Sequence, residues 1–136
     1  MATQIKGTNQ EFLEILKGLE VIKGIKGKTF GILVARNILH LSKHLKHIEN
    51  AAMPSTAFNE VAAVAHKFAE NEDTESLKAL EEEHKDVVDA RKKQLKEVEE
   101  MLLKESEVDV NLIREELIPD EVTAEQILPL LKILKD

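Results

Sequence analysis

The sequence predicts a mainly α-helical protein whose core is a long antiparallel helical hairpin. In residues 29–52, apolar residues recur every three or four positions, which places them on one side of a helix. Residues 76–104 form a second amphipathic run that can lie against the first. The chain has no Trp or Tyr and only four Phe, so its core must consist of Leu, Ile, Val and Ala. The apolar row of the first run is Val34, Ile38, Leu41, Leu45, Ile48 and Ala52.

A short N-terminal helix precedes this hairpin. Thr8 or Asn9 followed by Glu11 is typical of a helix start, and apolar residues at helical spacing continue to Leu19. We expect the helix to end near residues 18–20. In the segment that follows, two glycines and alternating Ile and Lys favour extended structure, which predicts a short strand at residues 22–26.

The first long helix should break or kink before Pro54, because proline disfavours helical dihedrals in the residue that precedes it. Ser55 or Thr56 can then cap a further helix over residues 58–69, where small Ala residues permit close helix approach. An acidic turn at residues 70–74 leads into the second long helix of the hairpin.

The C-terminal quarter begins with a predicted strand. Residues 108–112 alternate between apolar and polar, as a half-buried strand does, and they are the natural partner of residues 22–26 in a minor two-stranded element. A turn follows at residues 118–120. Thr123 and Gln126 have capping-box spacing, which predicts a short C-terminal helix that Pro129 must bend or shorten.

Six large aliphatic side chains gather in the last ten residues and leave that segment almost no polar side. They must either close the core of this molecule or dock into another one, because each stabilises by about 1.5–3 kcal/mol when fully buried. The residues predicted to form a partner interface are Ile127, Leu128, Leu131 and Leu134.

A length of 136 residues suits one domain, residues 1–136. The absence of cysteine excludes disulfides and thiolate zinc sites and fits a reducing compartment. The N-terminus is too short and polar for a signal peptide, and no apolar run approaches the roughly 20 residues that span a bilayer. We therefore expect a cytoplasmic protein without a membrane segment.

Charge is distributed unevenly along the chain. Residues 1–47 hold eight Lys/Arg and three Glu, whereas residues 48–136 hold eleven Lys/Arg and twenty-three Asp/Glu. The basic part can face the acidic helix of the same molecule or of a second copy, which is the favoured interpretation. Alternatively it contacts phosphate, and the candidate nucleic-acid contacts are then Lys23, Lys26, Lys28, Arg36, Lys43 and Lys46.

Three histidines, His40, His44 and His47, lie on one side of the first long helix at spacings of four and three residues. Imidazole nitrogens at such spacing can bind one zinc or nickel ion. Each histidine, however, directly precedes a residue of the apolar row, and boundary positions commonly hold amphipathic side chains. Boundary packing is the favoured interpretation, and a metal site is the alternative.

No arrangement in the sequence predicts catalysis. A cysteine nucleophile is absent, no Gly-x-Ser-x-Gly turn occurs, and the carboxylates are mostly spaced as a solvated helix side. We therefore expect a protein that is not an enzyme and that needs no cofactor.

The order of the predicted elements resembles that of small tailed-bacteriophage proteins of unknown function. It is a capped helix, a Gly/Lys-rich link at residues 23–28, a long helix, an acidic helical hairpin, residues 107–110 and a capped terminal helix. The resemblance implies expression in a bacterial host and a role in virion assembly or in binding a host protein. It assigns no site residue. The predicted function is a non-enzymatic interaction module that binds itself, a virion protein or a host protein.

Overall fold

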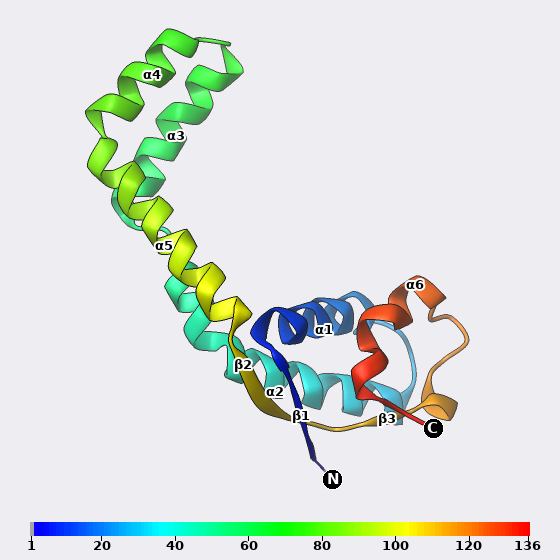
Figure 1. The fold of residues 1–136 in the computed structure, drawn as a ribbon. Helices are drawn as coiled ribbons and strands as arrows, with labels where there is room; N and C mark the ends of the chain where they lie inside the picture. Colours follow the sequence, from blue (N-terminus) through cyan, green and yellow to red (C-terminus); the bar gives the residue numbers. More distant parts are fainter. Residues whose placement is uncertain (1) are drawn as a thin grey trace. The chain divides into compact units, whose positions relative to one another are not determined.

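A computed structural model describes residues 2–136 and confirms a mainly α-helical protein, with 71% of the chain in helices (Figure 1). The chain forms two compact units. The first contains residues up to His47 together with Met101–Asp136, and the second contains Ile48–Glu100. The length predicts a single domain, residues 1–136, and this stays a prediction.

The first unit is built around helices α1 and α2. Of the two predicted helix starts, Thr8 and Asn9, the structure confirms Thr8, which caps α1 through a capping box with Glu11, and α1 buries Phe12, Ile15 and Leu19. The elements with residues in this unit are β1 (Thr3–Thr8), α1 (Asn9–Ile22), α2 (Lys28–Ala52), the end of α5 (Lys85–Leu103), β2 (Glu105–Val110), β3 (Ile113–Arg114), the 3-10 helix η1 (Glu115–Leu117), α6 (Ala124–Ile127), the 3-10 helix η2 (Leu128–Ile133) and β4 (Leu134–Lys135).

Helix α1 ends at Ile22, two residues past the predicted range of residues 18–20, and it continues through Gly18. Gly18 is buried, and a Cβ atom on it would lie 2.9 Å from Cγ of Pro129. This glycine therefore serves a close contact between α1 and η2 rather than a helix end.

The predicted strand at residues 22–26 was also wrong. Ile22 is the last residue of α1, and the chain then turns into α2. The strand that pairs with β2 is β1, antiparallel, with Thr3 opposite Val110 and Thr8 opposite Glu105. Its sequence holds only one large apolar residue, the half-buried Ile5, so it carried no clear alternation. The second predicted strand is confirmed in part, since Val108 and Val110 are buried in β2.

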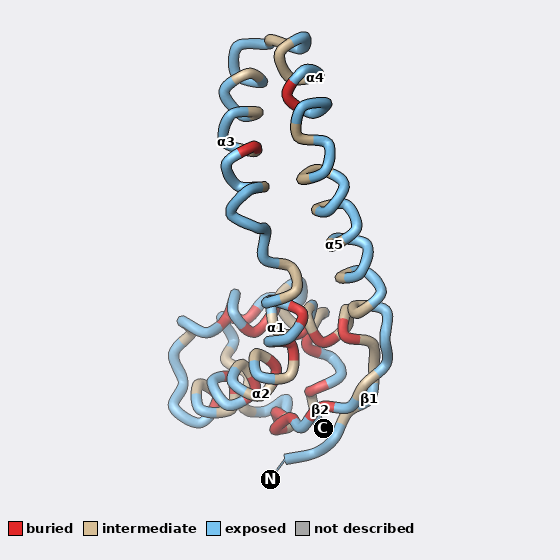
Figure 2. The backbone as a smooth tube through the Cα atoms, turned by 90° about the vertical axis from the view of Figure 1, so that its left-hand side faces the viewer, coloured by how far each residue is buried: buried red, intermediate tan, exposed pale blue. Residues whose placement is uncertain are grey.

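Helix α2 confirms the apolar row of the sequence in part, since Ile38 and Ala52 are only half-buried. Val34, Leu41, Leu45 and Ile48 are buried, and the helix ends at Ala52, before Pro54. Figure 2 shows the buried residues of the chain concentrated in α1, α2 and the segments packed on them.

The second unit consists of the end of α2, helices α3 (Thr56–Glu70) and α4 (Thr74–Glu83), and most of α5. The run predicted as one long helix breaks at His84, whose dihedrals (φ −110°, ψ 32°) leave the helical region. The residues predicted as one hairpin are also divided between two units, so no single long hairpin forms. No glycine or proline marks this break in the sequence.

The C-terminal segment forms the short capped helix that its sequence predicts. Thr123 and Gln126 form the capping box of α6, and Pro129 shortens this helix to one turn before η2 begins. Leu130 and Ile133 are buried in the first unit, and β4 pairs with β3 in parallel. In residues 2–136, no helix combines the length and the hydropathy that crossing a lipid bilayer requires.

Candidate protein-binding site

The second unit has an apolar groove between α3 and the α4–α5 segment, with a volume of about 440 Å³. Ala62, Ala65 and Ala69 lie on the α3 side, and Leu77, Leu80 and Val88 lie on the other. Phe58, Val61, His66 and Glu81 complete the lining.

Local sequence features position the two sides of this groove. The hydroxyl of Ser55 caps the start of α3 by accepting from Phe58 N–H, and the Asp73 carboxylate caps α4 by accepting from Ser76 N–H. These bonds satisfy backbone donors that each helix start leaves unpaired. The Arg91 guanidinium lies 5.4 Å from the centre of the Phe58 ring, which holds α5 against the start of α3.

Helix α5 also completes the end of α2. Arg91 Nη1 donates to the carbonyl of Ala52 at 2.8 Å, and Gln94 Nε2 donates to the carbonyls of Ala51 and Met53 at 2.7 Å. The last carbonyls of a helix have no partner within it, so these two side chains stabilise the turn around Pro54. Both residues were missed by sequence reasoning, because they look like ordinary solvated positions of an amphipathic helix.

The groove is incompletely filled. Only three large apolar side chains in residues 48–100 are buried, namely Ile48, Val61 and Leu80. In Figure 2, buried residues occur at a single place in α3 and a single place in α4. The alanines of α3, expected to permit close helix approach, instead form one wall of an open groove.

The second unit also carries the net charge of the protein. Residues 48–100 hold seven Lys/Arg and fourteen Asp/Glu, whereas the residues of the first unit hold twelve of each. Within residues 56–89 the imbalance is three basic against ten acidic residues. An apolar groove that has Glu81 in its lining and belongs to a segment of net charge −7 favours a basic partner with an apolar stripe.

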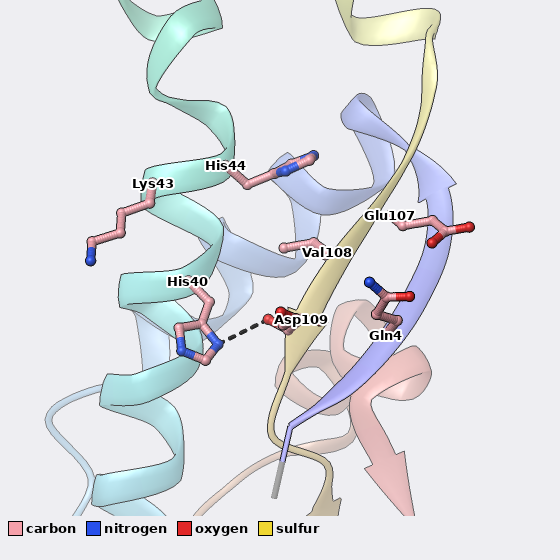
Figure 3. A pocket seen from close by; sticks show the side chains of 7 residues that line it. All are labelled: Gln4, His40, Lys43, His44, Glu107, Val108 and Asp109. Carbon is pink, nitrogen blue, oxygen red and sulfur yellow. Dashed lines mark hydrogen bonds between the residues drawn. The ribbon is translucent and has the colours of Figure 1, made fainter.

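The histidines of α2 lie beside a separate pocket of about 290 Å³ in the first unit (Figure 3). Nδ1 of His40 lies 2.9 Å from the carbonyl oxygen of Asp109, and both residues line the pocket with Gln4, Lys43 and Glu107. The pocket lies between α2 and the β1–β2 sheet.

His44 belongs to a directed chain of hydrogen bonds that joins α2, β2 and α1. The Ser106 hydroxyl donates to Asn9 Oδ1 at 2.6 Å, so its oxygen accepts from His44 Nε2 at 2.8 Å, and Asn9 Nδ2 donates to the Met101 carbonyl. Burial lowers the pKa of His44, and the neighbouring His47 lowers it further. His44 therefore has a packing role at the boundary of the core, where it also contacts the edge of Phe12.

These positions bear on the alternative of a metal site. His40 and His44 direct ring nitrogens to a backbone carbonyl and a hydroxyl, and His47 is exposed. Within the part of the chain that the structure describes, no three His, Asp or Glu side chains are placed to hold a metal ion.

The predicted C-terminal interface is partly exposed. Leu128 and Leu131 are 65% and 58% exposed, and Ile127 and Leu134 are half-buried. Ile127, Leu131 and Leu134 line a pocket of about 430 Å³ together with Ile118 and Val122. The terminal aliphatic residues thus close the core on one side and leave an apolar surface on the other.

The candidate nucleic-acid contacts are exposed but occupy different elements. Lys23 follows α1, Lys26 lies in the connecting turn, and Lys28 and Arg36 lie in α2. Nucleic-acid binding stays a prediction. If it occurs, the affinity for DNA or RNA should fall steeply as the salt concentration rises.

No protein-family model, curated protein or solved structure matches this chain. Its function is therefore inferred from the geometry and charge of its surfaces. Of these surfaces, the groove of the second unit combines the largest apolar share with the strongest charge imbalance.

Proposed function

We propose that this protein is a non-enzymatic protein–protein interaction module whose second unit binds a helix in its apolar groove. The observation that supports this proposal most directly is the open groove of about 440 Å³ in a unit with three buried large apolar side chains. A bound helix would remove Ala65, Leu77 and Val88 from water, and apolar burial contributes about 25 cal/mol per Å².

Binding would also stabilise the second unit, because a partner that binds only the folded form shifts the folding equilibrium toward that form. His40 and His44 bond to Asp109 and Ser106 within the fold, which supports a packing role for both. The exposed Leu128 and Leu131 supply a second apolar contact surface.

We further propose that the protein acts in the cytoplasm of a bacterial host, as the resemblance of its predicted element order to small tailed-bacteriophage proteins implies. Its partner is then a second copy, a virion protein or a host protein. These three possibilities share one requirement, a helix with an apolar stripe that fits the groove.

Site-specific photocrosslinking in the expressing cell tests this proposal. A benzophenone side chain at position 62, which lines the groove, should give a covalent adduct dominated by one protein, either this chain or another, as identified by mass spectrometry. The matched control replaces Ala90, an exposed residue of α5 outside the groove lining. Equal labelling at the two positions, or no adduct at position 62, would contradict the proposal.

A further inference from the structure

Helix α2 presents an exposed stripe that fits the groove in chemistry. Ile32 and Leu39 are 44% and 52% exposed, and Arg36 and Lys43 are exposed beside them. At about 3.6 residues per turn, these four positions lie on the side of α2 opposite Val34 and the rest of its buried row. We call these four residues the basic stripe.

The charges of the basic stripe and of the groove are complementary. Residues 28–47 of α2 hold four Lys/Arg and no Asp or Glu, whereas residues 56–89, which contain the groove lining with Glu81, hold ten acidic and three basic residues. Opposite charges around an apolar contact raise the association rate and suppress other orientations.

The lengths of the two surfaces also match. From Ile32 to Lys43 the basic stripe extends over about 17 Å of helix. The α3 wall of the groove runs from Phe58 to Ala69, again about 17 Å. Two apolar residues on the stripe, Ile32 and Leu39, are spaced by seven positions, so both point to the same side of the helix.

We propose that the basic stripe of one copy docks into the groove of a second copy. This inference rests on the proposed function and names the partner of the same groove. Because the two surfaces differ, the contact is heterologous: a pair joined by one such contact keeps one free groove and one free stripe. The assembly therefore extends into an open chain or closes into a ring.

A groove-to-groove dimer is disfavoured by the same charges, because it would bring two units of net charge −7 together. A stripe-to-stripe dimer likewise places Arg36 and Lys43 against their own copies. Only the stripe-to-groove pairing joins opposite signs over apolar surface.

Two variants test the proposal by complementation. The stripe variant carries Arg36→Glu and Lys43→Glu, and the groove variant carries Ala65→Lys and Glu81→Lys. All four positions are exposed or half-buried, and circular dichroism checks that each variant is folded. A control variant carries Ala63→Lys, which adds charge on the exposed side of α3.

Light scattering at about 100 μM should show assemblies of two or more copies for the wild type and for the control, and these should dissociate at high salt. Each test variant alone should be monomeric. Their equimolar mixture should associate, because the intact stripe of the groove variant can meet the intact groove of the stripe variant. The mixture also confirms that both variants retain a working surface.

A monomeric wild type would overturn this inference. So would assemblies that both test variants leave unchanged, or a mixture that remains monomeric. If position 62 still crosslinks to a different protein in these cases, the proposed function stands and only the second copy is excluded as partner. If position 62 gives no adduct, the proposed function fails as well.

Discussion

At the scale of single residues, Asn37 departs most from the pattern around it. Asn37 is polar, yet it lies within the apolar row of α2 and is completely buried. Its side-chain nitrogen donates to the Asn111 carbonyl at 2.8 Å, and its oxygen accepts from the Asn111 N–H at 2.6 Å. Asn37 thus joins α2 to the segment after β2 as a neighbouring strand would, by satisfying both polar groups of one buried residue.

Replacing Asn37 by Ala should lower the free energy of unfolding by about 2–4 kcal/mol, because both backbone groups of Asn111 lose their partner. Asn37→Asp retains an acceptor but sets a carboxylate against the Asn111 carbonyl, and burial raises the pKa of such a carboxyl. The loss caused by Asn37→Asp should therefore grow as pH rises through that raised pKa, and should be smallest near the usual Asp value of about 4. Urea unfolding at about pH 4.5 and 7.5 measures both effects. A pH-independent loss for Asn37→Asp would contradict this account.

His44 should make stability fall in acid. Because burial lowers the pKa of His44 in the folded protein, the unfolded chain binds a proton first as pH drops below about 6.5. This loss of stability is complete once the pH is below the pKa of His44 in the folded protein. His44→Gln should therefore lose less stability than the wild type between about pH 7.5 and 5, as measured by urea unfolding.

The control for this comparison is His66→Gln, at an exposed histidine of the second unit whose side chain is 74% exposed. The titration of carboxylates contributes equally to the pH dependence of stability in all three proteins. Identical pH dependence of His44→Gln and the wild type would exclude the proposed titration.

At the scale of elements, the contact between α1 and η2 depends on a missing side chain. A Cβ atom on Gly18 would lie 2.9 Å from Pro129 Cγ and 3.2 Å from Leu130 Cδ2. Leu130 and Ile133 are buried through this contact zone, so the close approach determines how the C-terminal segment completes the core. A second glycine, Gly31 in α2, has nothing within 4 Å of its Cβ position.

The two glycines should respond in opposite directions to alanine. Gly18→Ala gains helix propensity but forces Pro129 and Leu130 away, and overpacking of this kind costs about 1–3 kcal/mol. Gly31→Ala has no such clash and should stabilise by about 0.5–1 kcal/mol. Denaturant unfolding of the two variants against the wild type measures both. Stabilisation by Gly18→Ala would show that η2 does not approach α1 as described.

At the scale of the whole molecule, the two units differ in how much apolar surface they bury. Of the large apolar side chains that are buried, all but Ile48, Val61 and Leu80 belong to the first unit. The backbone amides of α3 and α4 should therefore exchange with solvent faster than those of α1, because local opening exposes little apolar surface there.

Hydrogen exchange followed by mass spectrometry measures this difference. Peptides from residues 56–83 should exchange at least about tenfold faster than peptides from residues 9–22, and high protein concentration should slow the former if the groove is occupied. Uniform protection along the chain of the monomer would instead favour one cooperative domain over residues 1–136.

The sequence by itself determined the helical class, both capping boxes, the break at Pro54 and the buried row of α2. These features depend on residues that are near one another along the chain, so local spacing and backbone preference are sufficient to specify them. Tertiary structure decided the pairing of β1 with β2, the close contact at Gly18 and the Asn37 pair. Each of these depends on residues or packing distant in the sequence, where no local pattern distinguishes one partner from another. The groove belongs to the same class: its alanines were visible in the sequence, but only the spacing between α3 and α4–α5 left them as an open wall.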